Sequence, residues 1–397
     1  MDKNSGALEG ILVVELGQLI AGPFCGQLLG DMGADVIKVE PPGAGDPMRQ
    51  WGNGEHKVWW EVIARNKRSV TANLRLPEGR ELVRKLVVGA DILIENFRPG
   101  TMEKWGLGPD QLHAINPDLI MVRISGYGQT GPYAERAGFG GIAEAMGGWR
   151  AIVGDPDRSP SRMGVSIGDT LAGNYGCMGA LAALREREKS GKGQVVDVAL
   201  YESVLQVMES LIVEYDAMGI VRQRSGAILP GIAPSNVYPC ADGEYMIGAN
   251  GDAIFARLAR AMGRPELALD ERYATHISRG KHQAELDAII ADWTRMLRVD
   301  DLERLMTEHS IPSGRLYTAP DMLVDPHFAA REAIVEVPHP YFGSLKMQAP
   351  VPKLSRSVSG VRRPAPRVPG ADNLPVYRDL LGITESELRR LKEANAI

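Results

Sequence analysis

The chain has 397 residues, of which 44% are hydrophobic and 24% are charged, and its formal net charge is −5. This composition excludes a disordered or fibrous chain, and the weakly acidic balance gives no electrostatic basis for binding nucleic acid. No segment approaches the roughly 18 uninterrupted apolar residues of a membrane-spanning helix, so we expect a cytoplasmic protein of about two domains, off the membrane, that binds small molecules.

The three cysteines, Cys25, Cys177 and Cys240, are scattered along the chain. They form no CxxC pair, and no histidine stands at ligand spacing from them. We therefore expect no disulfide framework and no zinc site.

The first two hundred residues alternate short β-rich segments with helical ones. Strands are expected over 11–16, 35–40, 68–74, 91–96, 118–125 and 194–200, and helices over 22–34, 77–90 and 171–189. Strands that are apolar on both faces and separated by helices are typical of a mainly parallel sheet covered on both sides. The pattern predicts a doubly wound, Rossmann-like α/β domain.

The pattern changes after a long helical segment over 201–219. A strand over 244–250 and amphipathic helices over 252–263, 281–297 and 299–310 predict a smaller α+β domain. Strands over 333–340 and 343–350, a proline-rich surface segment over 350–370 and helices over 374–382 and 385–397 complete the chain.

Glycines at 126, 128 and 131 follow the expected strand over 118–125 and formally match a dinucleotide-binding GxGxxG. That fingerprint requires a helix to open at the third glycine, and Pro132 and Tyr133 follow instead. The segment therefore favours a tight turn over a nicotinamide site. Such a turn still presents backbone N–H groups at the sheet edge where α/β proteins bind ligands.

Asp169 is the only carboxylate in the glycine-rich stretch MGVSIGDTLAGNYG (163–176). Two interpretations stay open from the residues alone. Asp169 can be the N-cap of a helix that begins near Leu171. It can also be a nucleophile, because a helix start keeps a carboxylate ionised and a carboxylate needs no general base.

The segment ENFRPG (95–100) follows another expected strand. It suits a turn, or recognition of an adenine nucleotide through Asn96, Phe97 and Arg98. Basic residues recur near strand ends, as a polyanionic ligand requires. They are Lys38, Lys67, Arg68, Arg75, Arg98 and Lys104.

Several stretches jointly resemble the class III coenzyme A transferases, the family of formyl-CoA:oxalate, carnitine and succinyl-CoA:dicarboxylate CoA-transferases. They are LEGILVVELGQLIAGPFCGQLLGDMGADVIKVEPPGAGDPMR (8–49), NKRSVTANLRLPEGRELVRKLVVGADILIENFRPGTMEKWGLG (66–108), ISGYGQTGPYAERAGF (124–139), GDTLAGNYGCMGALAALREREKSGKGQVVDVALYESVL (168–205) and DGEYMIGAN (242–250). The resemblance implies that acyl-CoA and small carboxylic acids are the substrates, with no metal and no permanently bound cofactor. It also implies that Asp169 is the catalytic nucleophile, acting through an aspartyl anhydride and an aspartyl-CoA thioester.

The resemblance also implies which residues contact CoA. They are Gln18, Ile20 and Ala21 near the thiol end, Arg75, Asn96, Phe97, Arg98 and Lys104 near the nucleotide, and Arg136, Ala137 and Phe139 along the approach to the site. It implies a large CoA-binding domain over 1–200 plus 326–397, a linker helix over 201–224 and a small selectivity domain over 225–325. The family forms interlocked homodimers, so a second copy is the expected protein partner.

The sequence departs from the family pattern at two places. Pro41 stands where formyl-CoA transferases have an arginine, so one nucleotide contact is expected to be lost or moved. The loop over 229–238 is short and poor in glycine, and together with guanidinium groups at Arg136, Arg222 and Arg224 it favours a small dicarboxylate such as succinate as substrate.

Two alternatives remain beside the transferase. An α-methylacyl-CoA racemase on the same fold needs a histidine and an aspartate as acid and base. No histidine lies between residues 114 and 275, and Phe139 stands where the racemases have theirs. A non-catalytic acyl-CoA binder would leave Asp169 only as a helix cap.

Overall fold

The computed structural model describes residues 6–397, which form two compact units. The sheet unit comprises the described residues up to Trp149 together with Met163–Leu211 and His327–Ile397. The small unit comprises Arg150–Arg162 and Ile212–Pro326. Every residue expected to act on CoA from the sequence lies in the sheet unit.

The sheet unit contains a six-stranded sheet with the strand order β3-β2-β1-β4-β5-β6 and parallel pairing throughout. Its strands are β1 (Leu12–Glu15), β2 (Asp35–Glu40), β3 (Lys67–Thr71), β4 (Ile92–Glu95), β5 (Ile120–Ser125) and β6 (Val195–Ala199). This is the expected doubly wound α/β fold. From β1 the strand order runs outward in one direction through β2 and β3, and from β4 it runs in the other direction through β5 and β6. Open α/β sheets bind their ligands beyond the carboxyl ends of the strands at the point where the strand order reverses, which here lies between β1 and β4.

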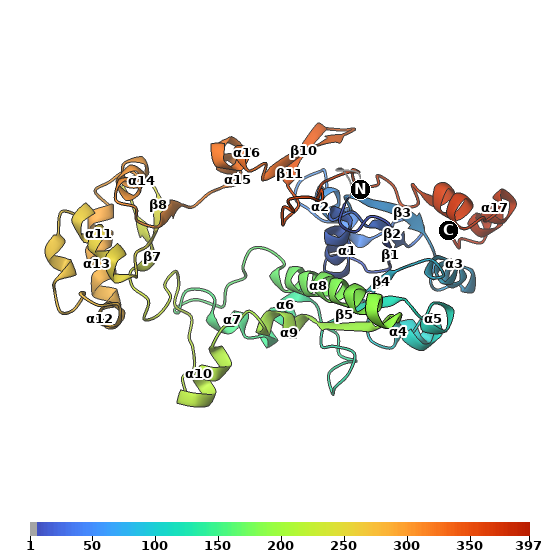
Figure 1. Ribbon diagram of the computed structural model, residues 1–397, viewed down its shortest axis with the longest axis horizontal. Coiled ribbons are helices and arrows are strands. Elements are labelled where there is room, and N and C mark those ends of the chain that lie inside the picture. The colour runs from blue at the N-terminus through green and yellow to red at the C-terminus, as the bar shows by residue number, and fades with distance from the viewer. Residues whose placement is uncertain (1–5) are drawn as a thin grey trace. The chain divides into compact units, whose positions relative to one another are not determined.

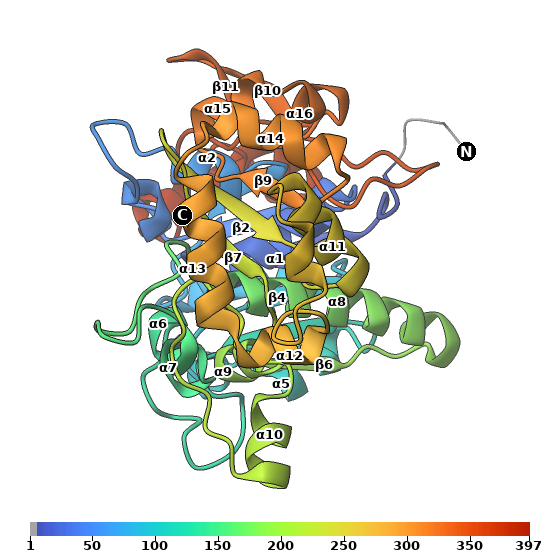
Figure 2. The ribbon, with the colours of Figure 1, turned by 90° about the vertical axis from the view of Figure 1, so that its left-hand side faces the viewer.

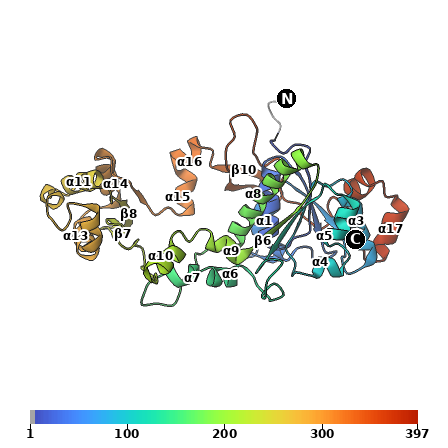
Figure 3. The same cartoon turned by 60° about the horizontal axis from the view of Figure 1, so that its bottom comes forward.

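Helices cover both faces of this sheet (Figure 1). Figure 3 shows α1 (Ala21–Asp31) and α8 (Ile167–Ser190) on one face, and α3 (Pro77–Val87), α5 (Pro109–Ile115) and α17 (Glu385–Glu393) on the other. Each face has its own apolar core, and all four residues of β4 are buried. A central strand that is apolar on both faces therefore behaves as its sequence predicted.

Shorter elements complete the sheet unit. They are η1 (Pro47–Gln50), α2 (Trp59–Ile63), α4 (Thr101–Lys104), α6 (Gly140–Met146), α9 (Leu200–Leu205), the hairpin β10 (Ile334–His339) and β11 (Gly343–Gln348), and η3 (Leu374–Leu380). The proline-rich segment 350–370 has no helix or strand, as expected. The segment is attached to the body of the sheet unit, because the buried Trp60 indole N–H donates to the Pro366 carbonyl at 2.8 Å.

The small unit has an antiparallel sheet of three strands, β7 (Ser235–Pro239), β8 (Glu244–Gly248) and β9 (Ser313–Arg315). Helices pack beside it (Figure 2). They are α11 (Asp252–Ala261), η2 (Pro265–Ala268), α12 (His276–Lys281), α13 (Gln283–Thr294) and α14 (Val299–Glu308). α15 (Ala319–Val324) belongs to the same unit but lies apart from this sheet. Tyr238, Phe255 and Leu286 share one buried core, so this unit has its own hydrophobic interior.

The prediction of a single helix over 201–219 is wrong. The structure has two helices, α9 and α10 (Leu211–Met218), separated by a turn in which Glu209 has a φ of 53°. A left-handed residue cannot continue a right-handed helix, so the turn ends α9. Two short helices, α7 (Trp149–Ile152) and α16 (Pro326–Ala330), lie where the chain passes between the units. In residues 6–397, every helix is too short or too polar to cross a membrane.

Candidate active site

Asp169 lies in the first turn of α8, which begins at Ile167. The helix was expected to begin near Leu171 with Asp169 as its N-cap, and that expectation is wrong. Ser166 occupies the N-cap position instead. The helix can extend this far because Gly168 has no side chain, and a Cβ there would lie 3.0 Å from the Gly140 carbonyl oxygen. Asp169 is therefore the third residue of the helix rather than its N-cap.

The Asp169 carboxylate packs against the backbone of Gly140, the first residue of α6. A Cβ built on Gly140 would lie 2.1 Å from Oδ2 and 2.8 Å from Cγ of Asp169. Position 140 therefore tolerates only glycine while the carboxylate stays in place. Two helix starts, those of α8 and α6, meet at one half-buried carboxylate, and the positive ends of the helix dipoles favour its ionised form.

The start of α1 faces the same side of α8 as Asp169. Gly173 follows Asp169 by four residues and so lies on the same face, one turn further along the helix. A Cβ at Gly173 would lie 2.9 Å from the Ala21 carbonyl oxygen. The glycine therefore lets α1 and α8 approach closely, and it brings Ala21, a predicted contact of the CoA thiol end, to the neighbourhood of Asp169.

A cavity of about 620 Å³ opens at the carboxyl ends of the central strands. Its lining includes Gln18, Arg75 and Phe97, three of the residues expected to bind CoA. The full lining is Leu16, Gln18, Val39, Glu40, Pro41, Pro42, Gly43, Ala72, Asn73, Leu74, Arg75, Phe97, Trp105 and Asn395. The cavity thus lies where the strand order predicts a ligand, and its size suits a nucleotide.

The cavity offers both an aromatic face and a cation. The Phe97 ring meets the Trp105 ring edge to face with 5.2 Å between centroids, while the Arg75 side chain is exposed at the cavity. Aromatic faces stack on adenine, and guanidinium groups bind phosphate. Pro41 belongs to the same wall, so apolar surface replaces the arginine that formyl-CoA transferases have there.

Asn96 is expected to contact the nucleotide, but its amide serves the protein backbone. The Gln18 N–H donates to Oδ1 of Asn96 at 2.8 Å, and Nδ2 of Asn96 donates to the Gln18 carbonyl at 2.9 Å. Ile20 lies in the same loop without lining the cavity. Asn96 therefore shapes the loop that carries Gln18.

The remaining predicted CoA contacts do not line this cavity. Arg98 and Lys104 are exposed next to β4 and in α4. Arg136, Ala137 and Phe139 form an exposed loop that leads directly into Gly140, and the Arg136 guanidinium lies 3.5 Å above the Tyr133 ring. Phe139 is 68% exposed at the N-cap position of α6. Phe139 directly precedes Gly140, which packs against Asp169, so this loop leads to Asp169 rather than to the cavity.

Two basic residues expected near a ligand-binding rim are instead buried inside the sheet. Lys38 and Lys67 form ion pairs with Glu15 at 3.2 and 2.7 Å, and all three side chains are essentially inaccessible. The prediction that these lysines meet a ligand is wrong. Both lie within strands, Lys38 in β2 and Lys67 in β3, and their ammonium groups are buried against Glu15. Arg68 pairs with Asp35 at the surface.

The arginines considered for carboxylate binding in the small unit have partners within that unit. Arg222 donates to both carboxylate oxygens of Glu214, at 2.7 and 2.6 Å. Arg224 donates to the carbonyls of Asp155 and Pro156, each at 3.1 Å. A substrate carboxylate would therefore compete with these interactions for either guanidinium.

The cysteines have the character expected of inert core thiols. Burial raises the pKa of Cys25 well above its usual value and that of Cys177 to about 12. Both are therefore protonated and unreactive at neutral pH. Within residues 6–397, no group of three or more metal-binding side chains is gathered closely enough to hold an ion.

Sequence reasoning missed Gly140, Leu19 and Asp46. Gly140 carries a weak signal, since the stretch GFGG (138–141) precedes a helix and is rich in residues without side chains. No local signal identifies Leu19, whose φ of 63° is left-handed although it is not a glycine. The sequence contains Asp46 only as one residue of the family-like stretch over 8–49. Its contacts with the Leu19 N–H and with Lys38 are what single it out in the structure.

Comparison with known proteins identifies the family of the chain. The family model for CoA-transferase family III matches residues 8–373. The chain is 57% identical, over 98% of both chains, to a protein from Chloroflexus aurantiacus named succinyl-CoA–D-citramalate CoA-transferase. It is 41% identical, also over 98% of both chains, to the beta subunit of succinyl-CoA–L-malate CoA-transferase from the same organism.

A solved structure gives the same result for the fold. The crystal structure of a CAIB/BAIF family protein from Brucella suis matches with a TM-score of 0.84 and 37% sequence identity. The match covers 95% of this chain and all of that one. On the extent of the family match and of these relatives, the chain belongs to CoA-transferase family III.

Proposed function

We propose that this CoA-transferase moves CoA from succinyl-CoA to a small hydroxydicarboxylic acid, with D-citramalate as the first candidate and L-malate as the second. Two relatives named for these acids support the choice, at 57% and 41% identity over nearly the full chain. The observation that carries the proposed chemistry is the Asp169 carboxylate, which packs on the Gly140 backbone where two helices start.

In the first half-reaction, an Asp169 oxygen attacks the thioester carbonyl carbon of succinyl-CoA. The C–S bond breaks, CoA leaves as a thiolate, and a succinyl-aspartyl anhydride remains. The thiolate then attacks the aspartyl carbonyl of the anhydride and releases succinate, which leaves an aspartyl-CoA thioester. Backbone N–H groups at the helix starts are suited to stabilise the oxyanion of each addition.

The second half-reaction repeats these steps with the acceptor. A carboxylate of the acceptor attacks the aspartyl thioester, and CoA thiolate leaves as a new mixed anhydride forms. The thiolate attacks the acceptor carbonyl and regenerates the Asp169 carboxylate. One thioester replaces another, so the exchange needs no external energy source and no net proton.

We propose that CoA enters with its nucleotide in the cavity at β1, β3 and β4. Arg75 would meet phosphate there, Phe97 would stack on the adenine, and Gln18 would lie toward pantetheine. Arg136, Ala137 and Phe139 would then border the path to Asp169. The assignment of acid selectivity to residues 225–325 and of a cytoplasmic location belongs to this proposal.

The substrate assignment is tested with a panel of acids. Purified protein is mixed with succinyl-CoA and one ¹³C-labelled acid, either D-citramalate, L-citramalate, L-malate, glutarate or oxalate, and the acyl-CoA products are measured by mass spectrometry. We expect labelled D-citramalyl-CoA to form fastest. Release of free succinate and CoA without labelled acyl-CoA would contradict transfer, and faster use of glutarate or oxalate would contradict the hydroxydicarboxylate.

We also propose that the chain works as an interlocked homodimer. The support from the described residues is α10, whose apolar side chains Ile212, Val213 and Met218 are 60%, 66% and 63% exposed. An exposed apolar helix is typical of a surface that a partner covers.

Sedimentation velocity of the wild-type protein should give twice the chain mass of 43.1 kDa. Val213→Asp should shift the distribution toward the single chain, because a charge in an apolar interface is costly. Val88→Asp, at a comparably exposed position after α3, is the matched control and should leave the mass unchanged. A wild-type mass of one chain under assay conditions would refute the dimer.

A further inference from the structure

The loop between β1 and α1 contains a residue in a strained backbone conformation. Leu19 has a φ of 63°, in the left-handed region that residues with a side chain rarely adopt. Such a conformation persists only where the surroundings impose it, and it is frequent where a protein positions functional groups. Leu19 lies between Gln18, which lines the nucleotide cavity, and the first turn of α1.

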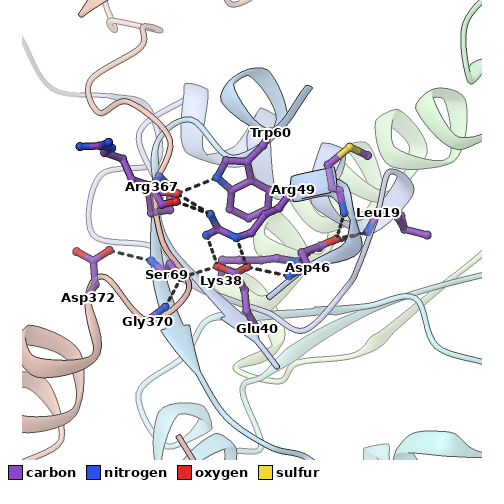
Figure 4. A network of polar contacts seen from close by, with 12 residues as sticks. Leu19, Lys38, Glu40, Asp46, Arg49, Trp60, Ser69, Arg367, Gly370 and Asp372 are labelled. Carbon is purple, nitrogen blue, oxygen red and sulfur yellow. Dashed lines mark hydrogen bonds and ion pairs between the residues drawn. The ribbon is translucent and has the colours of Figure 1, made fainter. Parts of the chain in front are cut away.

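Asp46 imposes this conformation from the neighbouring loop. Its carboxylate accepts from the Leu19 N–H at 3.0 and 3.3 Å and from the Met48 N–H at 2.9 Å (Figure 4). The side chain is fully buried. An acceptor in this position holds the Leu19 N–H in the one direction that the left-handed turn requires.

Lys38 connects both ends of the turn. Its ammonium group lies 2.7 Å from the Asp46 carboxylate and also donates to the Gly17 carbonyl. Burial opposes ionisation of Asp46, but the charge and hydrogen bond of Lys38 outweigh it and lower the pKa of the carboxyl below its usual value. Asp46 and Lys38 are therefore a charged pair at neutral pH, and together they fix the backbone on both sides of Gln18.

Further buried charges keep this pair in place. Glu15 binds Lys38 at 3.2 Å and Lys67 at 2.7 Å. Glu40 accepts from the Asp46 N–H at 2.9 Å and pairs with Arg49 at 2.7 Å. Three carboxylates thus face three cations in a buried cluster without net charge, as an ionic group in a protein interior requires.

We infer that Asp46 is a positioning residue of the transferase: through the Leu19 N–H it fixes the left-handed turn that sets Gln18 and the start of α1 relative to the CoA thioester. The inference rests on the proposed function, because the loop matters for turnover only if acyl-CoA reacts beside it. Asp46 itself touches no substrate. Its loss is therefore expected to reduce kcat while CoA still binds through the rest of the cavity.

The first test replaces Asp46 by asparagine, which keeps the shape but removes the charge. In either orientation the amide NH2 group faces another donor, either the Lys38 ammonium at the Oδ2 position or the Leu19 and Met48 N–H groups at the Oδ1 position, and the Lys38 charge is left unbalanced. We expect kcat to fall by at least about 50-fold while KM for succinyl-CoA changes less than about threefold. Asp31→Asn is the matched control. It breaks a buried ion pair with Arg65 at 2.6 Å, at the far end of α1, so it should lower the melting temperature similarly but leave kcat nearly unchanged.

The second test uses Leu19 and requires no loss of a buried charge. Valine keeps an apolar side chain but resists positive φ because it branches at Cβ, whereas asparagine is polar but accepts the left-handed region. We expect Leu19→Val to reduce kcat by about 10-fold and Leu19→Asn to stay within about threefold of wild type. The melting temperatures should follow the same order. Apolar packing alone would produce the reverse order.

The outcomes separate the two claims. Wild-type protein that transfers CoA to no acid refutes the proposed function, and the melting temperatures of the two Leu19 variants then still decide whether the turn is strained and held. If wild type is active, the positioning role is overturned by an Asp46→Asn variant with unchanged kcat. It is equally overturned if Asp31→Asn loses as much turnover, or if Leu19→Val outperforms Leu19→Asn.

Discussion

Asp169→Ala is expected to lower CoA transfer by about 10⁴-fold or more, because the proposed reaction loses the carboxylate that forms both covalent intermediates. The variant should stay folded. Asp169 is only half-buried in the first turn of a 24-residue helix, so its removal leaves the core of α8 intact. Transfer is measured as labelled acyl-CoA formed from succinyl-CoA, and folding is measured as the melting temperature.

Asp110→Ala is the matched control for this variant. Asp110 is likewise an acid in the first turn of a helix, α5. The Asp110→Ala variant should therefore retain full transfer activity and lose a similarly small amount of helix-end stabilisation. Hydroxylamine adds an independent readout. It should convert Asp169 to a hydroxamate only when acyl-CoA is present, because only an anhydride or thioester of the side chain is activated toward it. A fully active alanine variant, or modification at another residue alone, would exclude Asp169 as the nucleophile.

Gly140→Ala should reduce kcat by about 100-fold or more, since displacement of a reacting group by about 1 Å has effects of that size. The new methyl group would lie 2.1 Å from Oδ2 of Asp169, so the carboxylate must leave its position. The KM for succinyl-CoA should change little, because the cavity proposed to bind the nucleotide lies on other elements of the sheet unit. Steady-state kinetics with separate kcat and KM values test both statements.

Gly141→Ala provides the control at the adjacent position. The only neighbour within 4 Å of a Cβ there is Cε2 of Phe139, at 3.8 Å, which is an ordinary contact. Both variants exchange glycine for alanine in the first turn of α6, so their effects on helix propensity are alike. If the two variants have equal kcat values, the contact between Gly140 and Asp169 has no catalytic importance.

Most of the sheet unit is predictable from the sequence because its signals are local. The expected strand over 35–40 coincides with β2, and the other five strands of the sheet differ from expectation by a few residues at their ends. Short strands that are apolar on both faces and alternate with helices leave few alternatives to a parallel sheet. The elements of the small unit are harder to predict, because β7 and β9 are short and show no clear alternation of apolar and polar residues. The sequence pattern also joined α10 to α9 as one helix.

The sequence by itself determined the fold class and the family, and it singled out Asp169 as the candidate nucleophile, because strand patterning and a shared order of motifs are written in consecutive residues. Only the tertiary structure decided that Asp169 lies inside the first turn of α8 and against Gly140, which is 29 residues away in the chain. It also decided that Lys38 is a buried partner of Asp46 rather than a cation for the ligand. Charge, burial and backbone strain depend on residues brought together from different elements, and no local pattern contains that information.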